Sequence, residues 1–243
     1  MDGFCWKKSV AIVLAAGNGK RMQRTEKKQF IPLMGKPMLY YSLKAFSDIG
    51  IGKIILVTAQ EDFAYCKKQF GDTSVFNCPI ELAEGGKERY DSVYAGLQKA
   101  KGADYVFIHD GARPCLEKEV LKRVADAVTQ HGACVVAVPV KDTIKVVNTE
   151  GFAVETPDRS SLWAVQTPQV FSYEIIMDAY NRMMETLETG NRITDDAMVV
   201  ETFSGHLVKV VEGSYRNIKV TTPEDIAIAE ANLLDAWQEN EKK

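Results

Sequence analysis

The chain has little histidine, and this scarcity excludes two kinds of active site. Its 243 residues include only His109, His131 and His206, and no two of them have the spacing of paired metal ligands. A Gly-x-Ser-x-Gly nucleophile elbow is also absent. Zinc chemistry and serine-hydrolase chemistry, which depend on such residues, are therefore not expected.

Cysteine pairs, long apolar runs and a large net charge are lacking as well. The five cysteines are scattered without a Cys-x-x-Cys motif, which favours free thiols in a reducing cytoplasm. No run approaches the roughly 20 apolar residues of a membrane span, and the first residues lack the apolar core of a signal peptide. The formal net charge of −3 gives no global basic field, so neither nucleic acid nor a membrane is an expected partner.

The most informative stretch runs from Val10 to Gln29. Five apolar residues typical of a buried parallel strand lead into a turn that contains Gly17 and Gly19. Five basic residues follow in nine positions: Lys20, Arg21, Arg24, Lys27 and Lys28. A bare-backbone turn beside cations favours polyphosphate binding over an ordinary strand-to-helix turn with a solvated charged face. Neither the dinucleotide fingerprint nor the P-loop matches, because Met22 and Arg21 stand where glycine and Ser/Thr are required.

Strands and helices then alternate along the chain. Strands are expected at 10–14, 53–58, 81–84, 105–109 and 134–138, and helices at 38–47, 61–70, 88–100 and 117–130. This order predicts an α/β fold with a doubly wound, mostly parallel sheet, formed by residues 1–243 as a single domain. Ligands bind at the carboxyl ends of strands in such sheets, so the glycine turn, Gly85-Gly86 and the loop 110–113 are predicted to meet at one crevice.

Residues 140–166 depart from this alternation. Apolar and polar residues alternate around the Asn-Thr-Glu-Gly turn at 148–151, which predicts a hairpin. A lone two-stranded arm is marginal in water, so we expect this protruding β-arm to pack on a second subunit of a homodimer. Beyond it, helices are expected at 173–187 and 194–203, a strand at 207–211, and a helix from Thr222 whose core stripe comprises Ile226, Ala229, Leu233 and Trp237.

Few side chains stand out as candidates for chemistry. Asp110 follows a buried strand, where it could contact a metal or a ribose or could simply cap the next helix. His109 beside it is expected to be a structural hydrogen-bonding residue and not a catalytic one. Arg159 and Lys219 are isolated cations, and taken alone each is typical of a surface charge.

Eight short motifs occur in an order that resembles a known family. They are Leu14-Ala-Ala-Gly17-x-Gly19-x-Arg21-Met, Lys28-Gln29, Gly85-Gly86-x-x-Arg89-x-x-Ser92-Val93, His109-Asp110-x-Ala-Arg113-Pro114, Asp142-Thr143, Thr167-Pro168-Gln169, Thr194-Asp195 and Asn217-Ile-Lys219-Val-Thr221. Together they resemble the 2-C-methyl-D-erythritol 4-phosphate cytidylyltransferase family of non-mevalonate isoprenoid biosynthesis, with a Rossmann-like nucleotidyltransferase fold. The ribitol-5-phosphate cytidylyltransferases are the alternative, but they tend to have Leu-Ala-Gly-Gly at the first turn and His-Met-Tyr-Gln-Gly before Thr-Pro-Gln.

The resemblance implies a role for each matching residue. The nucleotide CTP would be bound by Ala15, Ala16, Gly17, Gly19, Gly85, Gly86 and Ser92, and Arg21 and Lys28 would be the catalytic cations. The polyol phosphate would be bound by Asp110, Arg113, Thr143, Arg159, Thr194 and Lys219. Mg²⁺ is the implied cofactor, with Asp110 as a candidate ligand, and a homodimer would bring Thr143 and Arg159 from the neighbouring chain.

Two departures from the family pattern are visible. Lys27 stands where the family usually has proline, which either loosens the loop before Lys28 or lets Lys27 share its role. Lys87 stands where acidic residues often follow the glycine pair.

Two other functional classes are alternatives. A nicotinamide oxidoreductase would need an acid where Val57-Thr58 ends a strand. A catalytically silent nucleotide-binding module would keep the glycine turns but tends to lose cations such as Arg21 and Lys28.

Overall fold

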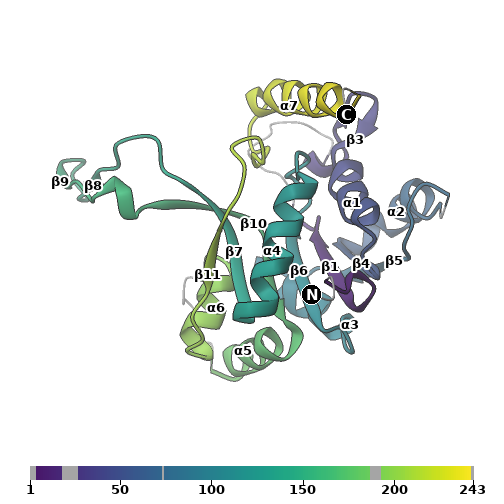
Figure 1. The fold of residues 1–243 in the computed structure, drawn as a ribbon, viewed down its shortest axis with the longest axis horizontal. Helices are drawn as coiled ribbons and strands as arrows, with labels where there is room; N and C mark the ends of the chain where they lie inside the picture. Colours follow the sequence, from purple (N-terminus) through teal and green to yellow (C-terminus); the bar gives the residue numbers. More distant parts are fainter. Residues whose placement is uncertain (1–3, 18–26, 73, 187–192, 242–243) are drawn as a thin grey trace.

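A seven-stranded sheet forms the centre of the molecule (Figure 1). The computed structural model describes residues 4–17, 27–72, 74–186 and 193–241, so Gly19 and Arg21 lie outside the described residues. The strand order is β11-β7-β10-β6-β1-β4-β5. The bounds are β1 Ser9–Leu14, β4 Lys53–Thr58, β5 Ile80–Glu84, β6 Tyr105–Asp110, β7 Ala133–Pro139, β10 Trp163–Ser172 and β11 Lys209–Glu212. Only β10 is antiparallel to its neighbours among these strands, which confirms the mostly parallel α/β sheet.

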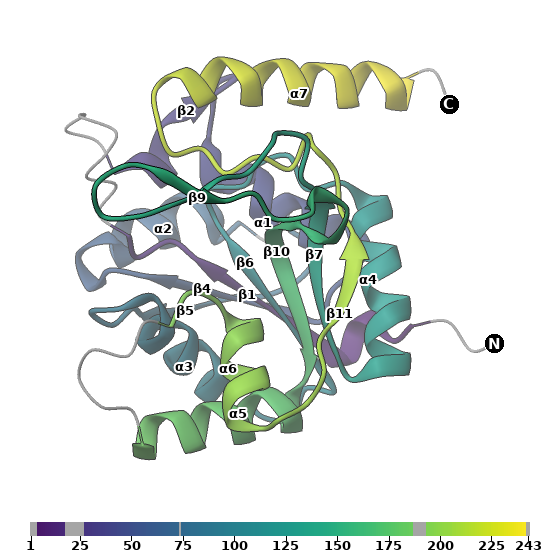
Figure 2. The same cartoon turned by 90° about the vertical axis from the view of Figure 1, so that its left-hand side faces the viewer.

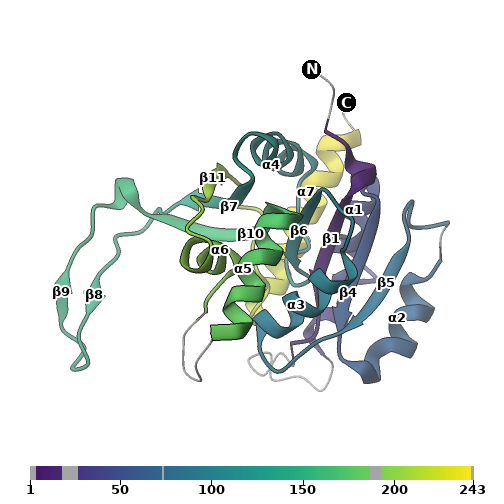
Figure 3. The same ribbon diagram turned by 90° about the horizontal axis from the view of Figure 1, so that it is seen from below.

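Helices cover both faces of this sheet (Figure 3). They are α1 Met38–Ile49, α2 Phe63–Phe70, α3 Arg89–Lys99, α4 Lys118–His131, α5 Tyr173–Thr186, α6 Asp196–Phe203 and α7 Glu224–Glu241. Successive side chains of β1 point to opposite faces, so Ala11 and Val13 join one hydrophobic cluster and Val10 and Ile12 join the other. Strands buried on both faces explain the continuous apolar runs in the sequence.

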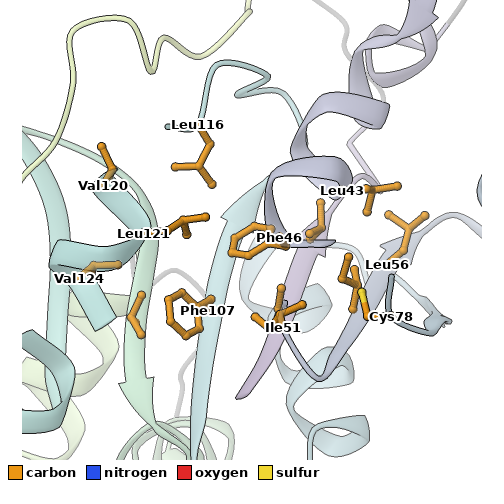
Figure 4. Packing of buried hydrophobic residues seen from close by; sticks show 14 of the residues in the cluster. Leu43, Phe46, Ile51, Leu56, Cys78, Phe107, Leu116, Val120, Leu121 and Val124 are labelled. Atoms are coloured by element: carbon orange, nitrogen blue, oxygen red, sulfur yellow. The ribbon is translucent and has the colours of Figure 1, made fainter. Parts of the chain in front are cut away.

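Figure 4 shows part of the cluster that α1 and α4 form against the sheet. Phe46 of α1 and Phe107 of β6 meet edge-on with ring centroids 6.1 Å apart, and neither side chain is exposed. Removing such a ring from a close-packed interior typically costs about 3–5 kcal/mol. This packing fixes the strands whose carboxyl ends carry the candidate site.

The sequence patterns missed β10 and a short hairpin. Pro168 lies in the interruption of the β7–β10 ladder between Val165 and Gln169, where no ladder hydrogen bond is required of it. No strand was predicted at 163–172, and a proline inside a strand is unusual away from sheet edges and bulges. The short hairpin consists of β2 Pro32–Leu33 and β3 Lys36–Pro37, for which no strand was predicted. The strand predicted at 207–211 begins at Lys209, and Leu207 is exposed.

The predicted hairpin is present and projects away from the sheet (Figures 1 and 3). Its strands are β8 Val146–Val147 and β9 Ala153–Glu155, joined by a turn in which the Asn148 side chain accepts hydrogen bonds from the backbone of Glu150 and Phe152. Phe152 and Val154 are 67 % and 61 % exposed. The arm therefore presents apolar side chains to its surroundings in the single chain.

Helix α7 lies along one side of the molecule, next to β2 (Figure 2). Ala229 is fully buried, and Ile226 and Leu233 pack partly buried against the same cluster. Trp237 was predicted to belong to this stripe, but it is 61 % exposed, because this cluster does not extend to the last turns of the helix. Within the described parts of the chain, none of the helices combines the length and the apolar character needed to cross a membrane.

Candidate active site

The three predicted loops meet at the carboxyl ends of β1, β5 and β6. Together they line a cavity of about 230 Å³. Its lining residues are Leu14, Ala15, Ala16, Gly17, Lys28, Gln29, Gly86, Lys87, Glu88, Arg89, Ser92, Asp110, Ala112 and Lys219. The sheet brings these loops together because β4, β1 and β6 are neighbours in parallel register. The prediction of a single crevice is confirmed.

Two of the loops touch so closely that one of them requires glycine. A Cβ atom at Gly85 would lie 2.3 Å from the Cβ of Ala16, and one at Gly86 would lie 2.2 Å from the Cβ of Asp91. The Ser92 hydroxyl fixes this turn, because it accepts a hydrogen bond from the Gly86 N–H at 3.1 Å. The close approach leaves backbone groups of the turn beside the cavity, where they could form hydrogen bonds with a planar ring.

Lys28 and Gln29 follow the undescribed segment 18–26 and occupy the short 3₁₀ turn η3 Lys28–Phe30. The buried Gln29 donates a hydrogen bond from Nε2 to the Ala15 carbonyl at 2.7 Å, which ties this turn to the end of β1. Lys28 lines the cavity. Lys27 lines neither this cavity nor the one described next, and its ammonium lies 2.8 Å from Glu61 Oε1 and 2.7 Å from Asp62 Oδ2.

A second cavity, of about 350 Å³, shares three charged residues with the first. The shared residues are Arg89, Asp110 and Lys219, and the other lining residues are Arg113, Val165, Gln166, Thr167, Gln169, Thr194 and Asp195. Asp110 therefore lies where the two cavities meet. This arrangement suits a reaction between two bound molecules.

Three cations surround the Asp110 carboxylate. Lys219 Nζ lies 2.8 Å from Oδ2, Arg89 Nε lies 3.7 Å from Oδ1 and Arg113 Nε lies 3.9 Å from Oδ2. Burial alone would raise the pKa of Asp110, but the charges of Arg89, Lys219 and Arg113 outweigh burial and hold that pKa well below its usual range. Asp110 is therefore ionised throughout the neutral range, and the surrounding positive charge remains available to anionic ligands.

Lys219 and Arg113 are positioned through a buried asparagine. Asn217 donates from Nδ2 to the Thr167 carbonyl at 2.8 Å, and the backbone carbonyl of Asn217 accepts from Arg113 Nη1 at 2.7 Å. Lys219 follows two residues later and points to Asp110. The buried, hydrogen-bonded Asn217 thus anchors the segment from which the Lys219 ammonium reaches the junction.

His109 lies beneath the site and supports its geometry. The Arg113 carbonyl can only accept, so His109 Nε2 donates to it at 3.2 Å and carries the proton of the neutral ring. Nδ1 then accepts from the Thr167 hydroxyl at 2.9 Å, and the same Oγ1 accepts from the Asp110 N–H at 3.1 Å. Complete burial lowers the pKa of His109 to about 4. A neutral ring that is hydrogen-bonded at both nitrogens agrees with the structural role expected of His109.

Sequence reasoning gave no role to the side chains that link α3 to α6. Arg89 Nη1 and Nη2 donate to Asp196 Oδ1 and Oδ2 at 2.9 and 2.7 Å, and the Tyr180 hydroxyl donates to Oδ1 at 2.7 Å. Arg89 stands in the quoted Gly-Gly-x-x-Arg motif, and that motif was the available signal. Gln169 was also missed; it contacts Asp195 and the Ala197 N–H, and so fixes the start of α6.

The residues predicted to bind the polyol phosphate fall into two groups. Asp110, Arg113, Thr194 and Lys219 line the second cavity. Thr143 and Arg159 lie on the exposed arm, and Arg159 donates to the Lys141 carbonyl at 2.8 Å. Neither of these two arm residues lines either of the two cavities in the single chain.

The acidic side chains of the site fit a metal ion that takes most of its ligands from substrate phosphates and water. In the described residues, no three His, Cys, Asp or Glu side chains cluster as a metal site. Asp110 is the one acidic side chain that lines both cavities, and Lys219 already pairs with it. Mg²⁺ commonly binds one or two carboxylates and takes its remaining ligands from substrate phosphates and water, so a single carboxylate is compatible with it.

Comparisons with known proteins agree with this geometry. The family model described as 2-C-methyl-D-erythritol 4-phosphate cytidylyltransferase matches residues 9–235. A protein of that name from Lachnospira eligens is 50 % identical over 222 residues, covering 91 % of this chain and 97 % of its own. Another, from Caldanaerobacter subterraneus subsp. tengcongensis, is 46 % identical over 225 residues, covering 92 % and 97 %.

Solved structures show the same fold. The crystal structure of 4-diphosphocytidyl-2C-methyl-D-erythritol synthase from Anaerococcus prevotii superposes with a TM-score of 0.81 at 30 % identity, covering 95 % of this chain and 100 % of that one. The Thermus thermophilus 2-C-methyl-D-erythritol 4-phosphate cytidylyltransferase gives a TM-score of 0.72 at 27 % identity, covering 90 % and 96 %. The chain belongs to the 2-C-methyl-D-erythritol 4-phosphate cytidylyltransferase family.

Proposed function

We propose that the two joined cavities bind CTP and 2-C-methyl-D-erythritol 4-phosphate side by side, so that they react at Asp110. Membership of the family makes the chain a nucleotidyltransferase of isoprenoid biosynthesis that forms 4-diphosphocytidyl-2-C-methyl-D-erythritol and pyrophosphate. The observation that carries the assignment of the site is the sharing of Arg89, Asp110 and Lys219 by both cavities. A carboxylate held among cations at such a junction can orient a ribose while the cations face the phosphates.

The first cavity is the proposed CTP site. The small residues Ala15, Ala16 and Gly17, together with Gly19, let the triphosphate approach the backbone after β1. The turn at Gly85, Gly86 and Ser92 selects cytosine through backbone hydrogen bonds. Lys87 lines the same cavity, so a cation faces the nucleotide where an acidic side chain is usual in the family.

The second cavity is the proposed acceptor site, and the chemistry needs no general base. An ionised phosphate oxygen of the acceptor attacks the α-phosphorus of CTP, and the bond from that phosphorus to the bridging oxygen of pyrophosphate breaks. Arg113, Thr194 and Lys219 hold the acceptor on the side opposite the nucleotide. Arg21 and Lys28 stabilise the charge that develops at the α-phosphorus, because phosphoryl-type transfers depend on positioning and on cations.

Mg²⁺ is the proposed cofactor. Asp110 is the residue that would hold it, together with the phosphates of CTP. The ion supplies charge neutralisation as pyrophosphate leaves. Removal of divalent cations with EDTA is therefore expected to abolish turnover, and addition of Mg²⁺ is expected to restore it.

The arm is proposed to join two copies of the chain. Its exposed apolar side chains, including Phe152 and Val154, support this proposal because such surfaces are normally covered. Thr143 and Arg159 would then reach the second cavity of the neighbouring subunit, where Arg159 would contact the acceptor phosphate. We also place the chain in the cytoplasm; the unpaired state of all five cysteines supports a reducing compartment.

The test is pyrophosphate release from CTP and Mg²⁺, with methylerythritol 4-phosphate and ribitol 5-phosphate measured in parallel. Turnover with the first acceptor alone is the expected result. Turnover with ribitol 5-phosphate alone would keep the mechanism and overturn the acceptor assignment. CTP binding without turnover of either acceptor would indicate a catalytically silent nucleotide-binding module.

A further inference from the structure

We propose that Lys27 is a positioning residue for Lys28, and that it acts through the two carboxylates it binds on the loop after β4. The inference rests on the proposed role of Lys28 at the α-phosphorus. It concerns a cation that follows the undescribed segment 18–26 and that the family pattern does not explain. Two roles are distinguishable: Lys27 contacts the triphosphate itself, or it fixes the backbone from which Lys28 reaches the cavity.

The contacts of Lys27 favour the second role. Its Nζ lies 2.7 Å from Asp62 Oδ2 and 2.8 Å from Glu61 Oε1. Asp62 is itself held, because Thr58 Oγ1, fully buried at the end of β4, donates to the same Oδ2 at 3.4 Å. The ammonium is thus bound to the body of the protein at a strand end and already has two anionic partners.

The residues that follow Lys28 are anchored as well. Gln29 donates to the Ala15 carbonyl, and the Phe30 ring contacts Tyr65 of α2 with centroids 4.5 Å apart. Lys28 directly precedes these anchors and lines the nucleotide cavity. Lys27 provides the anchor on the N-terminal side, so its ion pairs determine where the Lys28 backbone begins.

The backbone of Lys27 supplies an independent observation. Its φ and ψ angles are −62° and 131°, and the Phe30 N–H donates to its carbonyl at 2.9 Å. A proline ring fixes φ near this value, about −65°. A proline at position 27 could therefore hold, without any charge, the backbone conformation that the ion pairs of Lys27 hold.

The experiment compares Lys27→Met, the double variant Glu61→Gln with Asp62→Asn, the triple variant, and Lys27→Pro. The turnover number and the KM for CTP are measured at saturating acceptor and Mg²⁺. Lys99→Met is the matched control, because it removes an exposed lysine of α3 that pairs with Glu81 of β5 and lines neither cavity. Thermal unfolding of each variant shows that it is folded.

We expect Lys27→Met to lower kcat by about tenfold or more with little change in the KM for CTP, since misplacing a catalytic group lowers the rate of the chemical step. The carboxamide double variant is expected to show the same loss although Lys27 keeps its charge, and the triple variant to add nothing further. Lys27→Pro is expected to recover most of the turnover, and Lys99→Met to behave as wild type.

Three outcomes would overturn the proposal. A raised KM for CTP at unchanged kcat in Lys27→Met would make Lys27 a phosphate ligand. Normal turnover of the double variant, or no recovery in Lys27→Pro, would show that the ion pairs do not position the loop. Lys28→Ala in the same assay separates this proposal from the site assignment: if Lys28→Ala keeps full turnover, the role of Lys28 itself is wrong and the positioning role falls with it.

Discussion

Arg89 binds Asp196 through both terminal nitrogens, at 2.9 and 2.7 Å, across 107 positions of the sequence. Asp196 is fully buried, and the hydroxyl of Tyr180 donates to the same carboxylate. This pair joins α3, the helix after the Gly85-Gly86 turn, to α6, which begins beside the second cavity. The pair therefore ties together the elements that line the two cavities.

Asp196→Ala is expected to lower the free energy of unfolding by on the order of 3 kcal/mol, because it leaves a guanidinium and a hydroxyl without their partner. Denaturant unfolding measures this loss. Tyr180→Phe is the matched control, since it removes one hydrogen bond and should cost about 1 kcal/mol. If the two variants lose equal stability, the ion pair contributes nothing beyond the single hydrogen bond.

Lys28→Ala is expected to lower turnover about a hundredfold or more, with a modest effect on CTP affinity, because a cation aimed at developing charge acts mainly in the transition state. Steady-state pyrophosphate release gives kcat, and calorimetry gives the affinity for CTP. The exposed Lys101→Ala provides the control for loss of one positive charge. Turnover within tenfold of wild type would show that Lys28 is not the main catalytic cation.

Gly85→Ala is expected to weaken CTP binding, since its new Cβ would lie 2.3 Å from the Cβ of Ala16 and push the two loops apart. The same close contact supplies a rescue: Ala16→Gly removes the Cβ atom that clashes. The double variant should bind CTP more tightly than Gly85→Ala alone, as a double-mutant cycle would reveal. Additive losses would mean that the contact between the loops is not what constrains residue 85.

Protein stability is expected to fall as the pH drops from about 6.5 to 4, in part because of His109. Its pKa in the folded protein is about 4, below the usual 6.5, so the unfolded chain binds the proton first. Stability supplied by the neutral ring is complete above pH 6.5 and is lost progressively toward pH 4, by about 1.4 kcal/mol per pH unit at most. Urea unfolding at several pH values tests this.

The control for that measurement is His109→Gln, which retains a hydrogen-bonding side chain but does not titrate. Its stability is expected to be lower at pH 7 and to change less between pH 6.5 and 4 than that of the wild type. An unchanged slope would assign the pH dependence to other groups. Asp110 contributes little in this window, because the loss of its stabilising effect begins only as the pH falls to the ordinary carboxyl pKa of 3.8 and continues toward more acidic pH.

Subunit mixing tests whether Arg159 serves the neighbouring site. Lys28→Ala and Arg159→Ala are each expected to be nearly inactive. If Arg159 acts across the dimer, random mixing restores about a quarter of wild-type activity, because half of the dimers then contain one intact site of two. If Arg159 serves its own subunit, no mixture recovers activity, since every site keeps one of the two substitutions.

Phe152→Asp provides the matching test of assembly. The exposed ring is expected to lie in the dimer interface, where a carboxylate would be buried without a partner. Sedimentation should therefore show a shift from dimer to monomer, and activity should fall with it. A dimer of unchanged stability would place the interface elsewhere.

The sheet was largely predictable from the chain. Residues 10–14 and 54–57 are continuous apolar runs, and a strand buried on both faces needs such a run regardless of its neighbours. The meeting of the Gly17, Gly85 and Asp110 loops followed from one rule, that parallel strands end at the same edge. The antiparallel β10 was not predicted, and only the register shift beside β7 shows how the sheet accommodates Pro168 within it.

The sequence by itself determined the fold class, the crevice and the family motifs, because these depend on local periodicity, turn chemistry and chain order. Tertiary structure alone decided the pairing of Arg89 with Asp196, the support of Asp110 by His109 and Thr167, and the binding of Lys27 to Glu61 and Asp62. Each of these contacts joins residues from different elements. No spacing along the chain encodes them, since side-chain packing across the finished fold sets their distances.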